Sequence, residues 1–499
     1  MSDWQKWGVV VILILLAGGL RFYGLERESL WLDEAFTLRL APRSFGEIIE
    51  VSRTDVHPPL YYFLLHPLIK AGGGITAARA ASALFGILTA IAVFLLTKEL
   101  FGFNPSLLAL LFVVLNPFQI YFSQEARMHI FCTFFTVLAL WFFVRYLKLP
   151  SWWSLFAYFA ASLASLYTFY YGAFAVLSQS VFLLIYFRTH RRSVLKLLGA
   201  QALCLILFLP WIPILLGQIK IVISGYWIGK VLGPVSPRIV PEILVRMSSN
   251  IPLYLDRVHL GAMTAFLVVC ALILFLVFGR KPESIKGSAV LLGLFLLLPV
   301  VAGLVLSLKE RVILDRYFIV ASSALFPMIA AGVFRARPRW AGLVVALLIA
   351  LLNMAALIGG YNQPRKGPMR EMAAFVNAKW SPADAILHLH SHSYFPFLYY
   401  LSHDKPQYLL TPPGTPVDQE KVLIPEGGAV ANPAPVFTQS PRVWVVASFP
   451  YRGALPPPRG MVTVEEADFT YPDSWLSGRV VCFKKKTARE SANPVPVGK

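Results

Sequence analysis

Long apolar runs recur along this chain, and they constrain its fold more than any other feature. Examples are Val9–Leu20, Ser82–Leu96, Ala262–Phe278 and Leu343–Ile358. A membrane helix needs roughly 20 mainly apolar residues, which these runs reach with their flanks. Only 14% of the residues are charged, whereas a soluble domain carries about 25%. The sequence therefore predicts an α-helical polytopic membrane protein with about eleven transmembrane helices.

Basic residues gather in the loops that a cytoplasmic N-terminus would place inside, for example in Arg188–Lys196. The positive-inside rule then predicts that the alternate loops and the C-terminus lie outside. The net charge of +19 is explained by these topogenic clusters, so we expect membrane lipid and no nucleic acid as a partner.

The composition changes after Gly360, which predicts two domains. Residues 1–360 would form the transmembrane domain with its outer loops, and residues 361–499 a small extracytoplasmic α/β domain. In the second part Arg370–Lys379 has the spacing of an amphipathic helix, and short β-type runs such as Val443–Ala447 follow. The last stretch, Lys484–Lys499, is predicted to be a disordered tail.

Asp33 and Glu34 lie just past the first apolar run. Carboxylates at a membrane rim are costly to desolvate and indicate function. Because the two residues are adjacent, their side chains point about 100° apart on a helix. One of them is a candidate general base for an acceptor hydroxyl or amine. The alternative is that both stabilise the start of a helix near Ala35.

A second polar cluster contains Asp55 and His57, followed by Pro58-Pro59. The two prolines fix an extended backbone and then permit a helix from Leu60 onward. A helix N-terminus beside an imidazole favours an anion, particularly a phosphate. The alternative is a plain turn that opens a short apolar helix.

A third polar cluster is Gln124-Glu125-Ala126-Arg127-Met128-His129. Its spacing would put Glu125 and His129 on one helix face, with Arg127 pointing elsewhere. Arg79 and Arg316 lie at the outer ends of other predicted spans. Arginine suits bidentate phosphate contacts, so the three arginines predict a phosphate clamp. The alternative is that each extends to the lipid headgroups.

His388, His390 and His392 alternate, and a strand would present all three on one face. His390 and His392 are the candidate metal ligands, although no spaced carboxylate or cysteine completes the set. The alternative is a polar strand end. The four cysteines show no zinc or disulfide spacing.

Taken in order, these clusters resemble the GT-C membrane glycosyltransferases that use a polyprenyl-phosphate sugar. The protein O-mannosyltransferases and the lipid A aminoarabinose transferases are the most similar branches. The resemblance spans roughly residues 8–360, with the C-terminal domain matching more loosely. It rests on five short motifs: Asp33-Glu34, His57-Pro58-Pro59-Leu60, Ala77–Ser82, Gln124–His129 and Asp315-Arg316-Tyr317.

The resemblance implies a GT-C fold and an inverting transfer of a sugar from a polyprenyl-phosphate donor to a lipid, glycan or protein acceptor. It implies Asp33 as the catalytic base, with Glu34 beside it. Basic residues of the outer loops would hold the lipid phosphate. The implied substrate-binding set is Asp55, His57, Arg79, Gln124, Glu125, Arg127, His129, Asp315, Arg316 and Tyr317.

This chain departs from the family at His57, where the aminoarabinose transferases carry a lysine. Unlike a lysine, the His57 imidazole would be charged only if the bound phosphate raises its pKa. Some family members bind a divalent metal and others do not, so no cofactor is fixed by the resemblance. The expected location is a bacterial inner or plasma membrane, with the site outside. A flippase or transporter of lipid-linked sugar is the alternative function, and a non-enzymatic envelope assembly protein is a further one.

Overall fold

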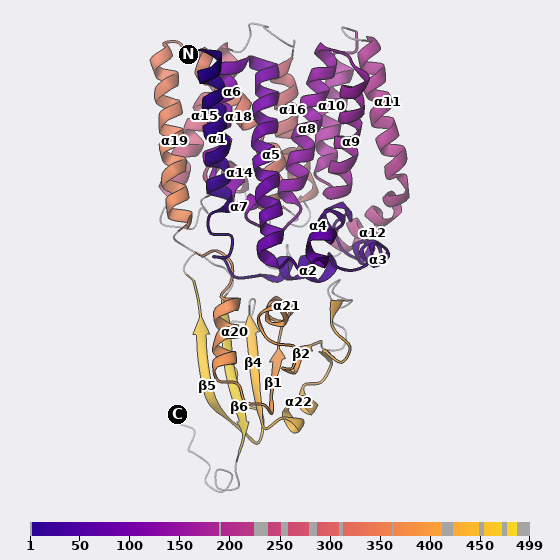
Figure 1. The fold of residues 1–499 in the computed structure, drawn as a ribbon, viewed down its shortest axis with the longest axis vertical. Coiled ribbons are helices and arrows are strands. Elements are labelled where there is room, and N and C mark those ends of the chain that lie inside the picture. The colour runs from indigo at the N-terminus through magenta and orange to yellow at the C-terminus, as the bar shows by residue number, and fades with distance from the viewer. Residues whose placement is uncertain are drawn as a thin grey trace. The chain divides into compact units, whose positions relative to one another are not determined.

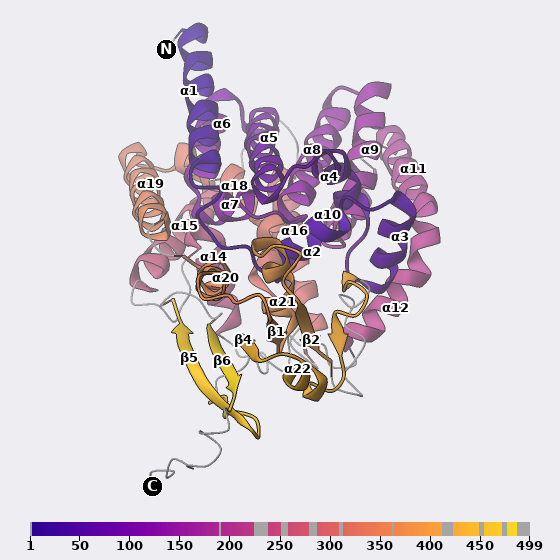
Figure 2. The same cartoon turned by 60° about the horizontal axis from the view of Figure 1, so that its bottom comes forward.

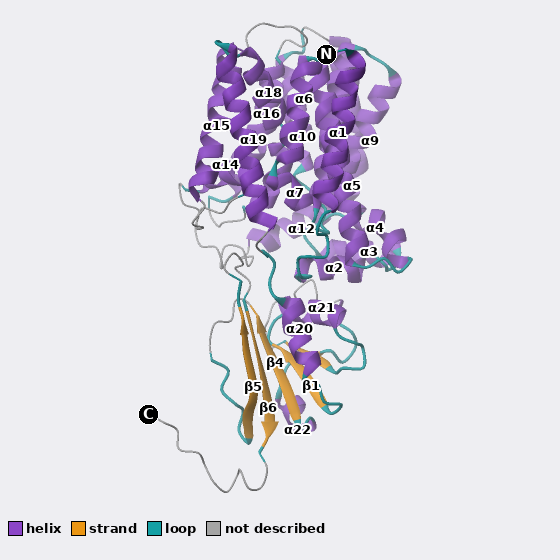
Figure 3. Cartoon of the chain, turned by 60° about the vertical axis from the view of Figure 1, so that its left-hand side comes forward, coloured by secondary structure: helices purple, strands orange, loops and turns teal. Residues whose placement is uncertain are grey.

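The computed structural model describes residues 2–188, 191–223, 238–250, 258–278, 287–308, 313–361, 364–411, 423–448, 454–471 and 477–486. The chain divides into two compact units, Met1–Leu25 with Ser44–Asn362 and Glu26–Arg43 with Gln363–Lys499. We call them the helical unit and the α/β unit. Every described strand lies in the α/β unit (Figure 3). The predicted boundary after residue 360 stays a prediction; the two units differ from it in one segment, Glu26–Arg43.

The helical unit is built on long, roughly parallel helices (Figure 1). These are α1 (Asp3–Phe22), α5 (Ile75–Phe101), α8 (His129–Lys148), α9 (Trp152–Thr168), α10 (Gly172–Ile185), α11 (Arg191–Phe208), α15 (Val258–Phe278), α16 (Ser288–Leu306) and α19 (Arg339–Tyr361). Shorter helices connect or extend them. These are α3 (Phe45–Thr54), α4 (Leu60–Lys70), α6 (Phe103–Leu115), α7 (Pro117–Ser123), η1 (Leu209–Trp211), α12 (Ile212–Ile223), α14 (Ile239–Ser249), η2 (Asp315–Phe318), α17 (Ile319–Ser322) and α18 (Leu325–Arg335).

Six helices in the described parts of the chain are long and apolar enough to cross a membrane, and eight if each of two bent pairs is one span. The bent pairs are α6–α7, at 60°, and Asp315–Ser322 with α18, at 48°. Gly172–Ile185 and Gly261–Ile273 are apolar but shorter. The predicted α-helical polytopic membrane protein with a small C-terminal sheet region is confirmed, whereas the total of about eleven spans stays a prediction.

The bend between α6 and α7 has a local cause at Asn116-Pro117. Pro117 lacks an N–H and disfavours a helical residue before it, so α6 ends at Leu115. The Asn116 side chain accepts a hydrogen bond from the Gln119 N–H at 2.9 Å and starts α7. The buried guanidinium of Arg21 donates to the carbonyl of Val113 at 3.1 Å, in the last turn of α6. A carbonyl at a helix end inside the membrane is thereby given a donor.

The α/β unit contains one six-stranded sheet of order β3-β2-β1-β4-β6-β5. Its first four members in that order pair in parallel, while β6 runs antiparallel to both β4 and β5. Figure 2 shows β5 and β6 at one edge of the sheet. The strands are β1 (Asp384–His388), β2 (Gln407–Leu410), β3 (Ala429–Val430), β4 (Arg442–Ser448), β5 (Met461–Phe469) and β6 (Gly478–Lys485). The helices are α2 (Leu32–Leu40), α20 (Met369–Ala378), α21 (Ser391–Tyr400) and α22 (Ala434–Gln439).

The central strands β1 and β4 are buried along most of their length and supply apolar side chains to both faces of the sheet. Ile386 and Trp444 pack with Met372 of α20 on one face. Leu387 and Val445, their sequence neighbours, belong to the cluster on the opposite face. Successive side chains on a strand point to opposite faces, so a continuous apolar run serves two layers.

Helix α2 belongs to this unit although it lies far from the others in sequence. It packs against α21, which begins just after the end of β1. In the part of the chain that the structure describes, Asp33 and Glu34 therefore belong to the unit that contains the sheet.

Candidate functional site

Cationic and ionisable side chains from three segments of the helical unit meet around His129. Arg127, Arg316 and His57 all lie close enough to interact electrostatically with its imidazole. His129 is 1% exposed, and neither of its ring nitrogens has a hydrogen-bond partner among the described residues. The structure therefore brings together four residues of the implied substrate-binding set, three of which, His57, Arg127 and Arg316, were expected to hold the phosphate.

Aromatic rings line this cluster. The Phe169 ring lies 5.7 Å from His57, 5.1 Å from His129 and 5.7 Å from Tyr317, measured between centroids. Tyr171 lies 4.9 Å from Tyr317. Phe169 and Tyr171 come from the turn between α9 and α10, which the sequence analysis did not assign to the site. Their signal was an aromatic run, which is also typical of a membrane interface.

This cationic cluster is suited to a phosphate group. A phosphate bound here would pair with the positive charges of the arginines, and such pairing offsets the cost of holding charges where water is scarce. Arginine offers two parallel N–H donors to phosphate oxygens, and the N–H group of an imidazole adds a further donor.

Asp55 lies in a polar network near the same segment as His57. Tyr62 donates its hydroxyl to the Asp55 carboxylate at 3.4 Å, and Tyr170 interacts with Asp55 electrostatically. The Trp211 indole N–H donates to the Tyr170 hydroxyl at 2.8 Å, and that hydroxyl also bonds Gln218. The network joins the loop before His57 to η1 and α12, which fixes the position of the imidazole.

The Gln124 side chain holds the backbone at the end of α1. Its amide donates to the backbone carbonyls of Leu20, Arg21 and Tyr23, at 3.2, 3.3 and 2.8 Å. These carbonyls lie at the end of α1, where no helical donor follows. Gln124 thus ties the third polar cluster to α1.

The predicted helix face of Glu125 and His129 is not formed. Residues 124–127 form a bend, 128 is a turn, and α8 begins at His129. The break at Asn116-Pro117 and the short α7 shift the start of the next helix past Glu125. Glu125 is buried in the bend, close in sequence to Arg127.

Asp315 shapes the turn that carries Arg316 and Tyr317. One carboxylate oxygen accepts the Arg316 backbone N–H at 2.8 Å. The other lies 3.5 Å from Nε of Arg246 on α14. Sequence reasoning missed Arg246, because no motif surrounds it and its contact spans two distant segments.

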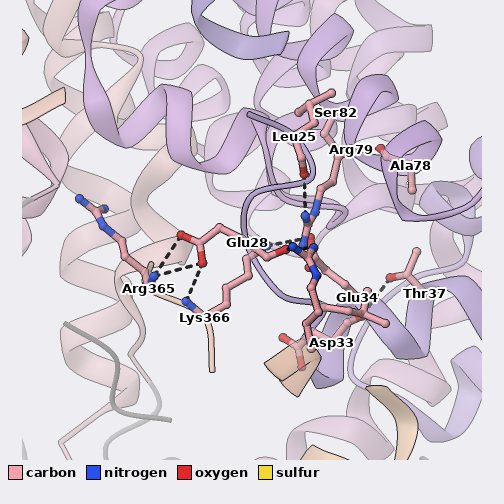
Figure 4. A network of polar contacts seen from close by, with 12 residues as sticks. Leu25, Glu28, Asp33, Glu34, Thr37, Ala78, Arg79, Ser82, Arg365 and Lys366 are labelled. Carbon is pink, nitrogen blue, oxygen red and sulfur yellow. Dashed lines mark hydrogen bonds and ion pairs between the residues drawn. The ribbon is translucent and has the colours of Figure 1, made fainter. Parts of the chain in front are cut away.

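Arg79 is buried and donates to the Leu25 carbonyl at 2.6 Å (Figure 4). Leu25 is the last residue of the helical unit before the Glu26–Arg43 segment. One N–H group of Arg79 therefore anchors the backbone where the Glu26–Arg43 segment begins.

Asp33 and Glu34 lie in the first turn of α2, as the helix-start alternative expected. Glu34 is 0% exposed and pairs with Nζ of Lys366 at 2.8 Å, whereas Asp33 is half-buried. The Asp33 backbone carbonyl accepts the Thr37 hydroxyl at 3.1 Å. Figure 4 shows the two carboxylates on their shared turn. The more accessible member, Asp33, has the better position for contact with a substrate.

The three alternating histidines do not lie on one strand. His388 ends β1, His390 precedes α21 as its N-cap, and His392 lies in the first turn of that helix. His388 contacts the Ser393 hydroxyl at 3.1 Å and the Gln407 side-chain carbonyl at 3.3 Å. Within the described residues no group of three or more His, Cys, Asp or Glu side chains is arranged to hold a metal ion.

Burial lowers the pKa of His388 to about 3 and that of His392 to about 4, the latter opposed by the nearby Asp33 carboxylate. Both imidazoles are therefore neutral at neutral pH. At the start of α21, the His392 imidazole interacts electrostatically with both Asp33 and His390.

The bundle of spanning helices with a small C-terminal sheet region is the fold of the GT-C membrane glycosyltransferases. Residues 56–214 match the family model described as dolichyl-phosphate-mannose-protein mannosyltransferase. The resemblance found in the sequence motifs is thus confirmed, as a family match over this segment and as a fold over nearly the whole chain.

Among solved structures, the chain is similar to ArnT from Cupriavidus metallidurans bound to undecaprenyl phosphate, with 15% identity, 96% of this chain and 98% of that chain covered, and a TM-score of 0.60. The same protein in the apo state gives 14% identity, coverage of 95% and 98%, and a TM-score of 0.60. The oligosaccharyltransferase AglB from Archaeoglobus fulgidus gives 13% identity, coverage of 90% and 70%, and a TM-score of 0.47. No curated protein matches the sequence.

Proposed function

We propose that this protein transfers a sugar from a polyprenyl-phosphate donor to an extracytoplasmic acceptor, with inversion at the anomeric carbon. The observation that carries the proposal is the cluster of two arginines, Arg127 and Arg316, with two histidines, His57 and His129. The proposed donor class is supported by the undecaprenyl phosphate bound to ArnT and by the dolichyl-phosphate-mannose named for the matching family. The acceptor would be a lipid, a glycan or a protein.

The transfer needs a base, a phosphate site and positioning, but no nucleotide. The acceptor O–H or N–H gives its proton to the Asp33 carboxylate as its oxygen or nitrogen bonds to the anomeric carbon. The bond from that carbon to the phosphate oxygen breaks, and polyprenyl phosphate leaves with the electron pair. Arg127 and Arg316 would stabilise the negative charge on the leaving phosphate, which is where preorganised donors contribute most.

Other predicted site residues take supporting roles in this proposal. Asp55, Gln124 and Asp315 hold the segments that carry the cations. Tyr317 and the rings beside it would form the apolar wall of the phosphate site. The proposed location is a bacterial inner or plasma membrane, with the reaction outside the cytoplasm. A divalent metal is not assigned a role.

The test uses the purified full-length protein in lipid nanodiscs with a panel of polyprenyl-phosphate sugars, and measures release of polyprenyl phosphate. Arg316→Ala should reduce release strongly. Arg53→Ala is the matched control, because Arg53 is an exposed arginine of the same unit, paired only with exposed Glu50 on α3 in the contacts described. Failure of every donor with every acceptor class, or equal effects of the two variants, would argue against the proposal.

A flippase of lipid-linked sugar is the second candidate, and the two bent helix pairs favour it. Discontinuous helices are common at the binding sites of transporters. The sequence analysis did not predict these bends. Asp33→Asn separates the candidates, since it should abolish transfer but leave donor binding intact. Transbilayer movement of the donor in proteoliposomes, with no transfer to any acceptor, would select the flippase.

A further inference from the structure

The Glu26–Arg43 segment is joined to the C-terminal part of the α/β unit by polar contacts on both sides of α2. Before α2, the Leu30 N–H donates to the Tyr400 hydroxyl at 2.6 Å, and the Ser29 hydroxyl donates to the Glu371 carboxylate at 3.1 Å. Near the end of α2, the Arg39 guanidinium donates to the Leu423 carbonyl at 2.9 and 3.1 Å. The helix is therefore held at both ends.

Glu28 fixes the backbone of the segment that faces α2. Its carboxylate accepts the Arg365 N–H at 3.0 and 3.1 Å and the Lys366 N–H at 3.0 Å (Figure 4). A carboxylate that accepts several backbone N–H groups forms strong, directional contacts. The Cα of Lys366 is thereby held in place before its side chain makes any contact.

From this fixed backbone, the Lys366 side chain reaches Glu34. The Nζ–Oε1 distance is 2.8 Å, and the two side chains are 5% and 0% exposed. A buried pair of this kind contributes little net stability compared with apolar residues, but losing one partner leaves a charge in the interior. Its best-supported use is to fix one arrangement among several.

We propose that Lys366 is a positioning residue for the transfer reaction: by holding Glu34, it orients the first turn of α2 and so the carboxylate of Asp33. This inference rests on the proposed function, because it gives Asp33 the role of base. It also assigns different roles to the two adjacent carboxylates. Glu34 serves as the attachment point, and Asp33, which points about 100° away on the helix, serves the chemistry.

The sequence offers no motif for this role. Lys366 follows Gln363-Pro364-Arg365 in a short polar stretch after α19. Only the fold of the α/β unit brings it to the first outer loop, 332 positions away from Glu34. A shift of the reacting carboxylate by about 1 Å is enough to lower turnover about 100-fold.

The test compares four full-length proteins: wild type, Lys366→Met, the double variant Lys366→Met/Glu34→Gln, and Lys379→Met. The double variant removes both charges together, so neither partner is left as a lone buried charge and we expect the fold to persist. Lys379 is the matched control, because it forms a lysine–glutamate pair with Glu465 in the same unit, but at the exposed surface. Each protein is assayed for kcat and donor KM, and for hydrogen–deuterium exchange of the α2 amides relative to β1 and β4.

We expect both Lys366 variants to lose about 10- to 100-fold in kcat with little change in donor KM, and to exchange α2 amides faster. The double variant should regain thermal stability without regaining turnover, which a purely structural pair would not produce. Wild-type kcat in the folded double variant would overturn the inference.

Asp33→Asn, assayed alongside, separates this inference from the proposed function. If Asp33→Asn is inactive while both Lys366 variants turn over as wild type does, only the positioning role is refuted. If Asp33→Asn itself transfers sugar at the wild-type rate, the assignment of the base is refuted, and the positioning role with it.

Discussion

Replacing each carboxylate of Asp33-Glu34 by its amide should separate chemistry from stability. Asp33→Asn keeps the shape and the hydrogen-bonding capacity of a half-buried side chain, so it should change the free energy of unfolding by about 1 kcal/mol or less. It removes the proton acceptor, so turnover should fall by about 10²–10⁴. Glu34→Gln should produce the opposite pattern.

The magnitude for Glu34→Gln follows from the buried pair. Lys366 is 5% exposed and Glu34 is 0% exposed, with 2.8 Å between them. Removing one partner of such a pair destabilises a protein by about 3–5 kcal/mol. At about 2–4 °C per kcal/mol for a unit of this size, the apparent melting temperature should fall by roughly 6–20 °C.

The assay is thermal unfolding followed by tryptophan fluorescence, paired with transfer measured well below the transition. Glu465→Gln is the control, because it breaks an exposed lysine–glutamate pair of the same unit and should cost at most about 1 kcal/mol. The reasoning is refuted by the reverse result, in which Asp33→Asn transfers at the wild-type rate and folded Glu34→Gln is inactive. Full activity in both variants would remove this turn from the mechanism altogether.

Three further outcomes are expected. Arg127→Ala and Arg316→Ala should each weaken binding of polyprenyl phosphate by about 1.5–3 kcal/mol, roughly 10- to 150-fold in Kd; unchanged affinity in both would leave them as headgroup anchors. Burial lowers the pKa of His388 to about 3, below the ordinary value near 6.5. The contribution of the buried neutral imidazole to the free energy of unfolding is therefore complete above pH 6.5 and is lost as the pH falls toward 3. The loss reaches about 2 kcal/mol at pH 5. It is measured as the fall in melting temperature with pH, and an equally steep fall in His388→Gln would show that protonation of His388 is not the cause. Single cysteines placed at Arg191 and Lys405 should label from opposite sides of the membrane, and labelling from one side would refute the orientation.

The fold class could be predicted because its signals are local. Apolar runs of membrane length and the shift in composition after Gly360 are visible without any contact information. The same holds for the helix Met369–Ala378 and for the central strands, whose continuous apolar runs supply both buried faces of the sheet.

Other features depend on contacts that no local pattern encodes. Phe169 and Tyr171 carry an aromatic signal that is shared with any membrane interface, and Arg246 carries none. The histidine alternation suggested a strand up to His392, but the chain turns into α21 after His388. Asn116-Pro117 is the exception, since its proline does mark the bend that the sequence analysis passed over.

The membership of Glu26–Arg43 in the α/β unit has a consequence for biosynthesis. Ser29 and its partner Glu371 are 342 positions apart, so a ribosome adding about 5–20 residues per second needs roughly 20 to 70 s between them. During that interval α2 has been made but the residues that hold it have not. The turn that carries Asp33 is completed only when the last quarter of the chain arrives. A prematurely terminated chain would therefore still lack the contacts that order the first turn of α2, and under the proposed mechanism it would transfer no sugar.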